Sequence, residues 1–306
     1  MNKIKSIEVK NFTKKFGDFT AVDNISFDVE QGSIFAFLGP NGAGKTTTIS
    51  TLCTIQEKTT GELKINGFDL DHHKDKVRKE IGIVFQDSTM DHKLTIEENL
   101  KLHCDFYNVP KKEIPERIAF VLQLVDLESR RKSPIESLSG GMKRRAEIAR
   151  GLVHYPKVLF LDEPTTGLDP QTRVNVWDYI LKLQKQKNIT IFLTTHYMEE
   201  AEICDQVAII DKGKIVAHDT PLNLKKKYSS TRMNIESSKP FELKSYFDSK
   251  SIKYVEKESL ISAFIQSTEQ IMEIMNDNRN IINDLEVSKG SLNDVFLNIT
   301  GKEIRE

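Results

Sequence analysis

Residues 34–47 read Ile-Phe-Ala-Phe-Leu-Gly-Pro-Asn-Gly-Ala-Gly-Lys-Thr-Thr. The five apolar residues predict a buried strand, and the residues after them fit the pattern G-x-x-x-x-G-K-[ST] ahead of a helix expected from about Lys45. The glycines allow successive backbone N–H groups to point into one concavity, where they bind phosphate oxygens beside the positive end of the helix dipole. The predicted nucleotide-binding residues of this loop are Gly39, Pro40, Asn41, Gly42, Ala43, Gly44, Lys45, Thr46 and Thr47.

Two side chains of this phosphate loop have expected roles of their own. The ammonium group of Lys45 would reach the β- and γ-phosphates of a nucleotide, and the hydroxyl of Thr46 would be a ligand of Mg²⁺. The alternative interpretation is a glycine turn that joins a strand to a helix and carries a surface lysine. Because every fixed position of the pattern is filled and an apolar strand precedes it, the sequence favours the phosphate loop.

A second apolar segment ends in two acidic residues. Residues 158–161 lead directly into Asp162 and Glu163. A parallel sheet binds ligands at the carboxyl ends of its strands, so Asp162 is predicted to hold Mg²⁺ and Glu163 to orient or activate an attacking water. Adjacent carboxylates repel each other unless a cation lies nearby, and Mg²⁺ would supply one. By itself the pair could be a solvated strand end, but together with the phosphate loop it favours a functional site.

The composition limits the class of protein. The chain has 306 residues, a length for which we expect two domains, and its 44 basic and 45 acidic residues leave a formal charge of −1. This balance argues against a protein that binds nucleic acid through bulk charge. Apolar runs such as 34–38 and 207–210 are far shorter than the roughly 18–20 residues of a membrane-spanning helix. The widely spaced Cys53, Cys104 and Cys204 fit neither a disulfide framework nor a paired metal site, and they favour a reducing compartment.

Residues 4–38 read as strands and turns, and farther along the first 221 residues strands alternate with helical stretches. Strands are expected at 6–10, 25–29, 34–38, 158–161 and 190–193. This alternation predicts a mainly parallel α/β sheet, and the phosphate loop after one of its strands is the motif of P-loop NTPases. A charged, helical pattern over about 90–150 predicts an inserted helical subdomain.

The pattern changes near Pro221, so residues 222–306 are predicted to form a separate accessory domain. Short strands are expected there at 233–236, 252–255, 260–266 and 281–287, with helices at 241–250 and 269–278. The order β-α-β-β-α-β matches a small α+β, ferredoxin-like module. Its balanced charge excludes a basic nucleic-acid arm.

A further motif connects these observations to a known family. The motif Leu138-Ser139-Gly140-Gly141-Met142 precedes a predicted helix, and its Ser139 lies 23 residues before Asp162. Along the chain, the phosphate loop is followed by this motif, by the strand ending in Asp-Glu, by Gly167-Leu168-Asp169 and by His196. This order resembles that of the ATP-binding cassette (ABC) ATPases. The resemblance covers about residues 4–221. It implies an ABC ATP-binding domain over residues 1–221 that binds ATP and Mg²⁺.

The resemblance implies roles for three more residues of the nucleotide site. Phe16 would stack on adenine, with Phe19 as the competing aromatic and a core position as the plain alternative. Gln86 would be the Q-loop glutamine that touches Mg²⁺ and the catalytic water, unless it is a solvated strand end. His196 would be the switch histidine at the γ-phosphate, so that it would join Lys45, Gln86 and Glu163 as a catalytic residue.

Four residues are implied to serve the opposite subunit. Ser139, Gly140 and Gly141 would be the signature that binds the γ-phosphate of ATP held by a second cassette, and Asp169 would lie in the D-loop across the same interface. Ser139 with two glycines is also good helix-capping chemistry, and this role is compatible with phosphate binding. Met142 stands where many family members have glutamine, and methionine cannot donate a hydrogen bond.

Three segments narrow the resemblance to one branch of the family. The motif Ser-Gly-Gly-Met with basic residues 143–145, the segment 195–202 and the segment 291–301 resemble the daunorubicin-resistance-type (ABC-2 type) exporters. The plain alternative for 291–301 is an ordinary amphipathic helix.

The branch implies an ATPase subunit that powers a membrane exporter of drugs or other hydrophobic compounds. Two cassettes would form a head-to-tail dimer, either of identical chains or with a related cassette. A separate polytopic permease would dock near Gln86 and residues 87–110 and would hold the chain on the cytoplasmic face of the membrane. No nucleic-acid partner is expected.

The competing class is a soluble ABC protein that acts on ribosomes or DNA. Such proteins usually carry two cassettes, or long coiled coils or zinc motifs between the phosphate loop and the signature. Only 94 positions separate Lys45 from Ser139 here, with no heptad run and no paired cysteines. The sequence therefore favours the transporter.

Overall fold

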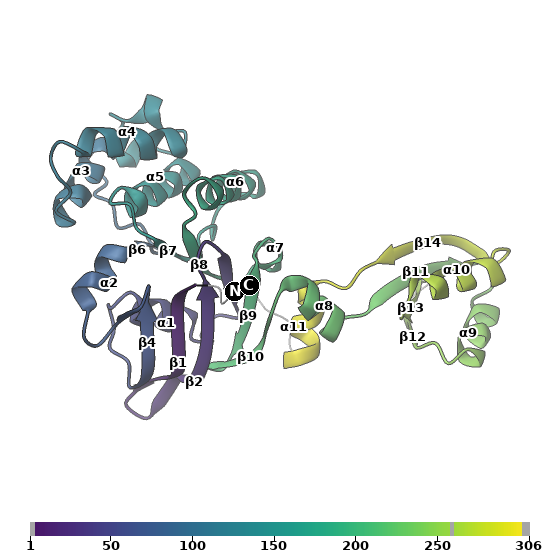
Figure 1. Cartoon of the computed structure of the whole chain (residues 1–306). Helices are drawn as coiled ribbons and strands as arrows, with labels where there is room; N and C mark the ends of the chain where they lie inside the picture. Colours follow the sequence, from purple (N-terminus) through teal and green to yellow (C-terminus); the bar gives the residue numbers. More distant parts are fainter. Residues whose placement is uncertain (1–3, 258–259, 302–306) are drawn as a thin grey trace. The chain divides into compact units, whose positions relative to one another are not determined.

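The chain folds into two compact units, one ending at Thr220 and one beginning at Pro221. The structure is a computed structural model, and it describes residues 4–257 and 260–301. Figure 1 labels most of the helices and strands of the two units, which are numbered in chain order.

The first unit is built around a six-stranded sheet with the order β10-β9-β3-β8-β7-β6. The strands from β9 to β6 run parallel, and β10 is an antiparallel edge. Every residue of β3, β7 and β8 is buried, as continuous apolar runs predict for strands covered on both faces. The strands are β3 (Ile34–Leu38), β6 (Ile81–Val84), β7 (Val158–Asp162), β8 (Thr190–Thr195), β9 (Gln206–Asp211) and β10 (Lys214–Asp219).

A second, antiparallel sheet belongs to the same unit, with the order β2-β1-β4-β5. The expected strands at 6–10 and 25–29 lie in this antiparallel sheet, whereas those at 34–38, 158–161 and 190–193 lie in the mainly parallel one. Its strands are β1 (Lys5–Phe16), β2 (Phe19–Glu30), β4 (Thr60–Ile65) and β5 (Phe68–Asp69).

One hydrophobic core joins the two sheets. Phe27 of β2 packs against Phe35 of β3 and Phe192 of β8, with ring centroids 5.4 and 5.9 Å away. Phe160 of β7 meets Phe192 at 5.5 Å. These large buried rings fix the sheets against each other and thereby fix the strand ends that carry the site.

Helices follow the strands of the first unit. Among them are α1 (Lys45–Leu52), α2 (Lys74–Glu80), α6 (Pro170–Lys187) and α7 (Met198–Glu202). Three more, α3 (Ile96–Phe106), α4 (Ile114–Leu124) and α5 (Gly140–Leu152), contact one another and gather on one side of the unit in Figure 1. Short 3₁₀ turns, Glu128–Arg130 and Ile135–Ser137, join α4 to α5. A capping box of Thr95 and Glu98 begins α3, as expected for the chemistry of helix starts.

The second unit contains an antiparallel sheet with the order β12-β13-β11-β14. Met233, Ile235, Phe247, Ile261 and Ile274 belong to its hydrophobic core. Its elements are α8 (Pro221–Tyr228), β11 (Thr231–Ser237), α9 (Pro240–Ser249), β12 (Tyr254–Lys257), β13 (Leu260–Ile265), α10 (Thr268–Asp277), β14 (Ile282–Ser288) and α11 (Leu292–Thr300).

Within residues 4–257 and 260–301, no helix is both long enough and apolar enough to cross a lipid bilayer.

Candidate active site

Four neighbouring strands of the six-stranded sheet end at the candidate site. The phosphate loop follows β3, His196 follows β8, Glu163 follows β7, and Gln86 lies two residues beyond β6. Because these strands are parallel, their carboxyl ends meet at the same edge of the sheet, where open α/β sheets bind ligands. The topology thus brings together residues that lie far apart in the sequence.

A pocket of about 710 Å³ opens at this edge. Its volume is in the range of small-molecule sites. Of the predicted residues, it gathers Phe16, most of the phosphate loop, Gln86, Glu163 and His196. The residues that line it are Phe16, Phe19, Ala21, Asn41, Gly42, Gly44, Lys45, Thr46, Thr47, Gln86, Glu163, Thr166, His196 and Tyr197.

The phosphate loop depends on two glycines in left-handed conformations. Gly42 has φ +79° and Gly44 has φ +106°, which only glycine adopts without strain. A Cβ on Gly44 would also lie 2.7 Å from the carbonyl oxygen of Ala21. Gly44 is the N-cap of α1, so the free N–H groups of the first helical turn face the pocket that Thr46 and Thr47 line.

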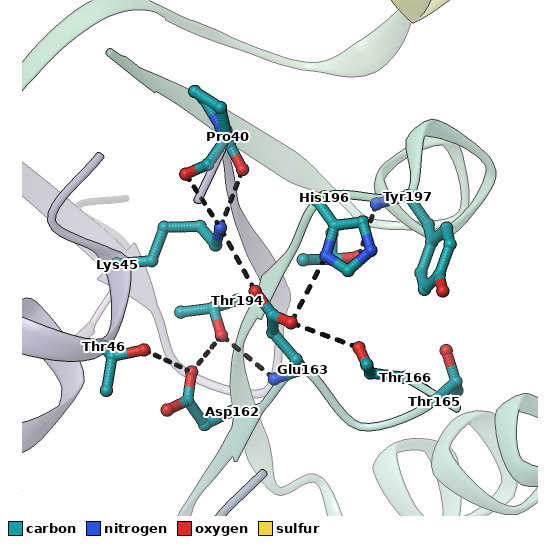
Figure 2. Close-up of polar contacts among 12 residues, drawn as sticks. Pro40, Lys45, Thr46, Asp162, Glu163, Thr165, Thr166, Thr194, His196 and Tyr197 are labelled. Carbon is teal, nitrogen blue, oxygen red and sulfur yellow. Dashed lines mark hydrogen bonds and ion pairs between the residues drawn. The ribbon is translucent and has the colours of Figure 1, made fainter. Parts of the chain in front are cut away.

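The ammonium group of Lys45 is buried among oxygens. Its Nζ atom donates to the carbonyl oxygens of Gly39 at 2.7 Å and Pro40 at 3.2 Å, and it lies 3.2 Å from Oε1 of Glu163 (Figure 2). Burial lowers the pKa of Lys45, while the charge of Glu163 opposes that shift. The lysine is thus a desolvated cation at the floor of the pocket, which suits the binding of phosphate oxygens.

Glu163 is held in a strained backbone conformation. Its φ is +46°, uncommon for a non-glycine residue and typical of functional sites. Besides Lys45, its carboxylate meets Nδ1 of His196 at 3.3 Å and accepts from the hydroxyl of Thr166 at 3.2 Å. Burial favours a higher pKa, but Lys45 and His196 outweigh it and hold the pKa of Glu163 below its ordinary value. The carboxylate is therefore ionised at neutral pH and able to accept a hydrogen bond.

Asp162 faces the phosphate loop at the end of β7. Its Oδ1 atom accepts from the hydroxyl of Thr46 at 3.4 Å and from that of Thr194. Burial raises the pKa of Asp162, and the two hydroxyls oppose that shift. A carboxylate and a hydroxyl oxygen this close are hard ligands of the kind that Mg²⁺ takes from proteins, while it keeps other positions for water and phosphate. These residues fit a Mg²⁺ ion.

Ser139, Gly140, Gly141 and Asp169 do not line this pocket. They form a second group at two adjacent helix starts. Ser139 caps α5 by accepting from the N–H of Met142 at 3.3 Å, and Asp169 caps α6 by accepting from the N–H of Thr172 at 3.0 Å. A Cβ on Gly141 would lie 2.3 Å from the methyl carbon of Thr172, so the two helix starts pack closely.

Several residues of the site were not identified from the sequence. Thr166 and Tyr197 line the pocket, Thr194 bonds to Asp162, and Arg144 bonds to the backbone of Glu163. Thr194 and Tyr197 lie within two residues of the predicted His196, which is a local signal. Arg144 carried a signal too, because it is a charged residue on the same face of α5 as buried apolar residues.

Comparison with known proteins supplies independent information. The ABC transporter family model matches residues 22–166. The linearmycin resistance ATP-binding protein LnrL of Bacillus subtilis is 34% identical over 315 residues, which cover 98% of this chain and 100% of that protein. The probable multidrug ABC transporter ATP-binding protein YbhF of Escherichia coli is 40% identical over 219 residues, or 72% of this chain. The chain spans only 38% of the length of YbhF.

Solved structures resemble the first unit. The cbiO1 protein of Clostridium perfringens, part of the ABC transporter complex cbiONQ, has a TM-score of 0.69 at 28% identity and covers 74% of this chain and 92% of its own. A dimeric, post-hydrolysis state of the ATP-binding cassette MJ0796 with ADP and Pi has a TM-score of 0.63 at 26% identity and covers 70% and 98%. A relative matched over its whole length and this shared fold lead to one conclusion: the chain belongs to the ATP-binding proteins of ABC transporters, and its first unit is an ABC ATPase domain.

Proposed function

We propose that this chain hydrolyses ATP as the energy-supplying subunit of a membrane exporter for drugs or other hydrophobic compounds. The observation that carries the proposal is the pairing of Lys45 with Glu163 at 3.2 Å, beside the facing oxygens of Thr46 and Asp162. The names of two relatives, a probable multidrug ABC transporter ATP-binding protein and a linearmycin resistance ATP-binding protein, support export.

The nucleotide would be held from both of its ends. Backbone N–H groups of the phosphate loop and the ammonium group of Lys45 would bind the phosphates. Phe16 would stack on adenine, since 46% of its side chain is exposed at the rim of the pocket. Phe19 lines the same rim and is 65% exposed, so it is the competing platform.

Hydrolysis transfers the γ-phosphoryl group to water, giving ADP and phosphate. Glu163 accepts a hydrogen bond from the attacking water and orients it, and the imidazole of His196 contacts the γ-phosphate. Lys45 neutralises charge that develops on the phosphate oxygens. Thr46, Asp162 and Gln86 would hold Mg²⁺, which would supply positive charge to neutralise the phosphates.

A second cassette would complete each site. Ser139, Gly140, Gly141 and Asp169 are accessible at their helix starts and lie outside this chain's own pocket. Backbone N–H groups at a helix start bind anions, so these residues suit the γ-phosphate held by an opposed, head-to-tail cassette. The dimeric cassette with ADP and Pi supports this arrangement. The partner would be a second copy or a related cassette.

ATP hydrolysis by this chain would drive transport through a separate permease. We place its docking surface near Gln86 and residues 87–110, which contain the exposed side chains of Leu102 and Phe106 on α3. The relative cbiO1, which is part of a transporter complex, supports such an assembly. In this assembly the chain would lie on the cytoplasmic face of the membrane.

The second unit would be an accessory module of ferredoxin-like type over residues 222–306. Its chain order from β11 to β14 is β-α-β-β-α-β, and its antiparallel sheet places β11 between β13 and β14. This order of strands supports the assignment.

The proposal is tested by phosphate release from MgATP with the purified chain. We expect turnover that Lys45→Ala abolishes, together with weaker nucleotide binding in a fluorescence titration. Lys157→Ala is the matched control, since that lysine is 64% exposed and pairs with Glu80 outside the pocket. Unchanged affinity and turnover in Lys45→Ala would overturn the proposal. Stimulation of turnover by ribosomes or DNA, and not by a co-expressed membrane protein, would favour the competing class.

A further inference from the structure

Arg144 is a buried cation in the helix that begins at the signature. It lies in α5, five residues after Ser139, and only 7% of its side chain is exposed. Its guanidinium donates to the carbonyl oxygen of Pro164 at 2.6 Å, of Asp162 at 3.1 Å and of Glu163 at 3.3 Å. It also donates to the carbonyl oxygen of Phe85 and to the carboxylate of Glu147, the latter at 2.9 Å.

All five N–H donors of the group are therefore used. A guanidinium has five such donors in a rigid plane, and four of them here bind backbone carbonyls of two separate segments. Glu147, which is 4% exposed, balances the buried charge. A surface or purely charge-pairing arginine would not need this arrangement.

The two segments that Arg144 binds both carry site residues. Phe85 immediately precedes Gln86, and the other three carbonyls belong to the turn that contains Glu163. Glu163 has a φ of +46°, and a strained residue persists only when its surroundings over-determine its conformation. Bonds to the carbonyls of Asp162, Glu163 and Pro164 supply that constraint on both sides of the strained residue.

We propose that Arg144 is a positioning residue that fixes the backbones of Gln86 and Glu163 relative to each other and to the signature helix. The inference rests on the proposed ATP hydrolysis. Arg144 does not line the pocket, so its loss should misplace the two site residues without removing any contact to nucleotide. A misplacement of about 1 Å can cost about 100-fold in rate.

The test compares variants of the full chain in MgATP turnover and in binding of a non-hydrolysable ATP analogue. Arg144→Lys keeps the charge and the pairing with Glu147 but lacks the planar fork of donors. The double variant Arg144→Gln/Glu147→Gln removes both buried charges, so that no carboxylate is left unpaired. The matched control is Arg145→Gln, one residue along the same helix. Arg145 bonds the carbonyls of residues 125 and 126 and the hydroxyl of Tyr179, away from the site.

We expect the double variant to lower kcat by about 100-fold and Arg144→Lys by about 10-fold, with KM and the Kd of the analogue within about twofold of wild type. Arg145→Gln should leave kcat within about twofold of wild type, even if its melting temperature falls as far as that of the Arg144 variants. Wild-type kcat in either folded Arg144 variant, or an equal loss of kcat in Arg145→Gln, would overturn the inference. If the wild-type chain itself releases no phosphate, the proposed function is wrong, and the inference about Arg144 fails with it. A loss confined to the inference would show as wild-type turnover in the Arg144 variants.

Discussion

The ion pair between Lys45 and Glu163 should stabilise the first unit even without nucleotide. The two groups lie 3.2 Å apart, with exposures of 4% and 8%. At an effective dielectric constant of about 20, their attraction is about 5 kcal/mol. Part of this attraction is offset, because each group keeps other partners when its ion-pair partner is replaced. Lys45 keeps two carbonyl oxygens, and Glu163 keeps His196. We therefore expect a coupling of about 1–3 kcal/mol in a double-mutant cycle of Lys45→Met and Glu163→Gln.

The cycle can be measured by urea unfolding followed through tryptophan fluorescence. Trp177 is the single tryptophan of the chain and is buried in α6, so the signal reports the first unit. Lys45→Met should be the more destabilising single change, because it leaves a buried carboxylate without its main partner. The control is the Lys157–Glu80 pair, of similar length at 3.1 Å but with an exposed lysine; its coupling should be at most about 1 kcal/mol. A Lys45–Glu163 coupling no larger than the control would refute the reasoning.

Three further predictions address other parts of the chain. Burial lowers the pKa of His103 to about 3 and of His154 to about 4. Between about pH 6.5 and pH 5, the unfolded chain therefore binds a proton at each histidine and the folded chain does not. The free energy of unfolding should fall by about 2 kcal/mol per histidine between about pH 7 and pH 5. Replacing both by glutamine should remove that fall, and an unchanged pH dependence would show that they do not cause it. Ser139→Arg should still bind ATP as a monomer but form no ATP-driven dimer in size-exclusion chromatography with light scattering; normal dimerisation would exclude a signature that acts in trans. Phe16→Ala should weaken ATP binding by about 1–3 kcal/mol, the worth of a stacked base, and a larger loss in Phe19→Ala would assign the platform to Phe19.

The phosphate loop is the part of the site that the sequence specifies most completely. Its conformation depends on local glycine chemistry at Gly42 and Gly44, and its place follows from the apolar strand before it. The carboxylates at the end of β7 are accessible to the same reasoning, because parallel strands deliver their carboxyl ends to one edge.

Other features depend on long-range packing and left little trace in the sequence. The antiparallel sheet of β1, β2, β4 and β5 forms by pairings between distant segments, and alternation of short strands does not distinguish it from an edge of the parallel sheet. The strained φ of Glu163 and the five contacts of Arg144 are set by tertiary structure. The helix pattern indicates at most that Arg144 is buried, and it does not indicate which carbonyl groups the side chain binds.

The central claim is that Glu163 activates the water that attacks ATP, and Glu163→Gln tests it most directly. The amide has nearly the same shape and can still accept a hydrogen bond from Lys45, but it cannot accept a proton. Steady-state phosphate release from MgATP should fall by about 100-fold or more, while ATP binding persists and the ATP-bound dimer accumulates. Phosphate release at the wild-type rate by a correctly folded Glu163→Gln chain would contradict the claim.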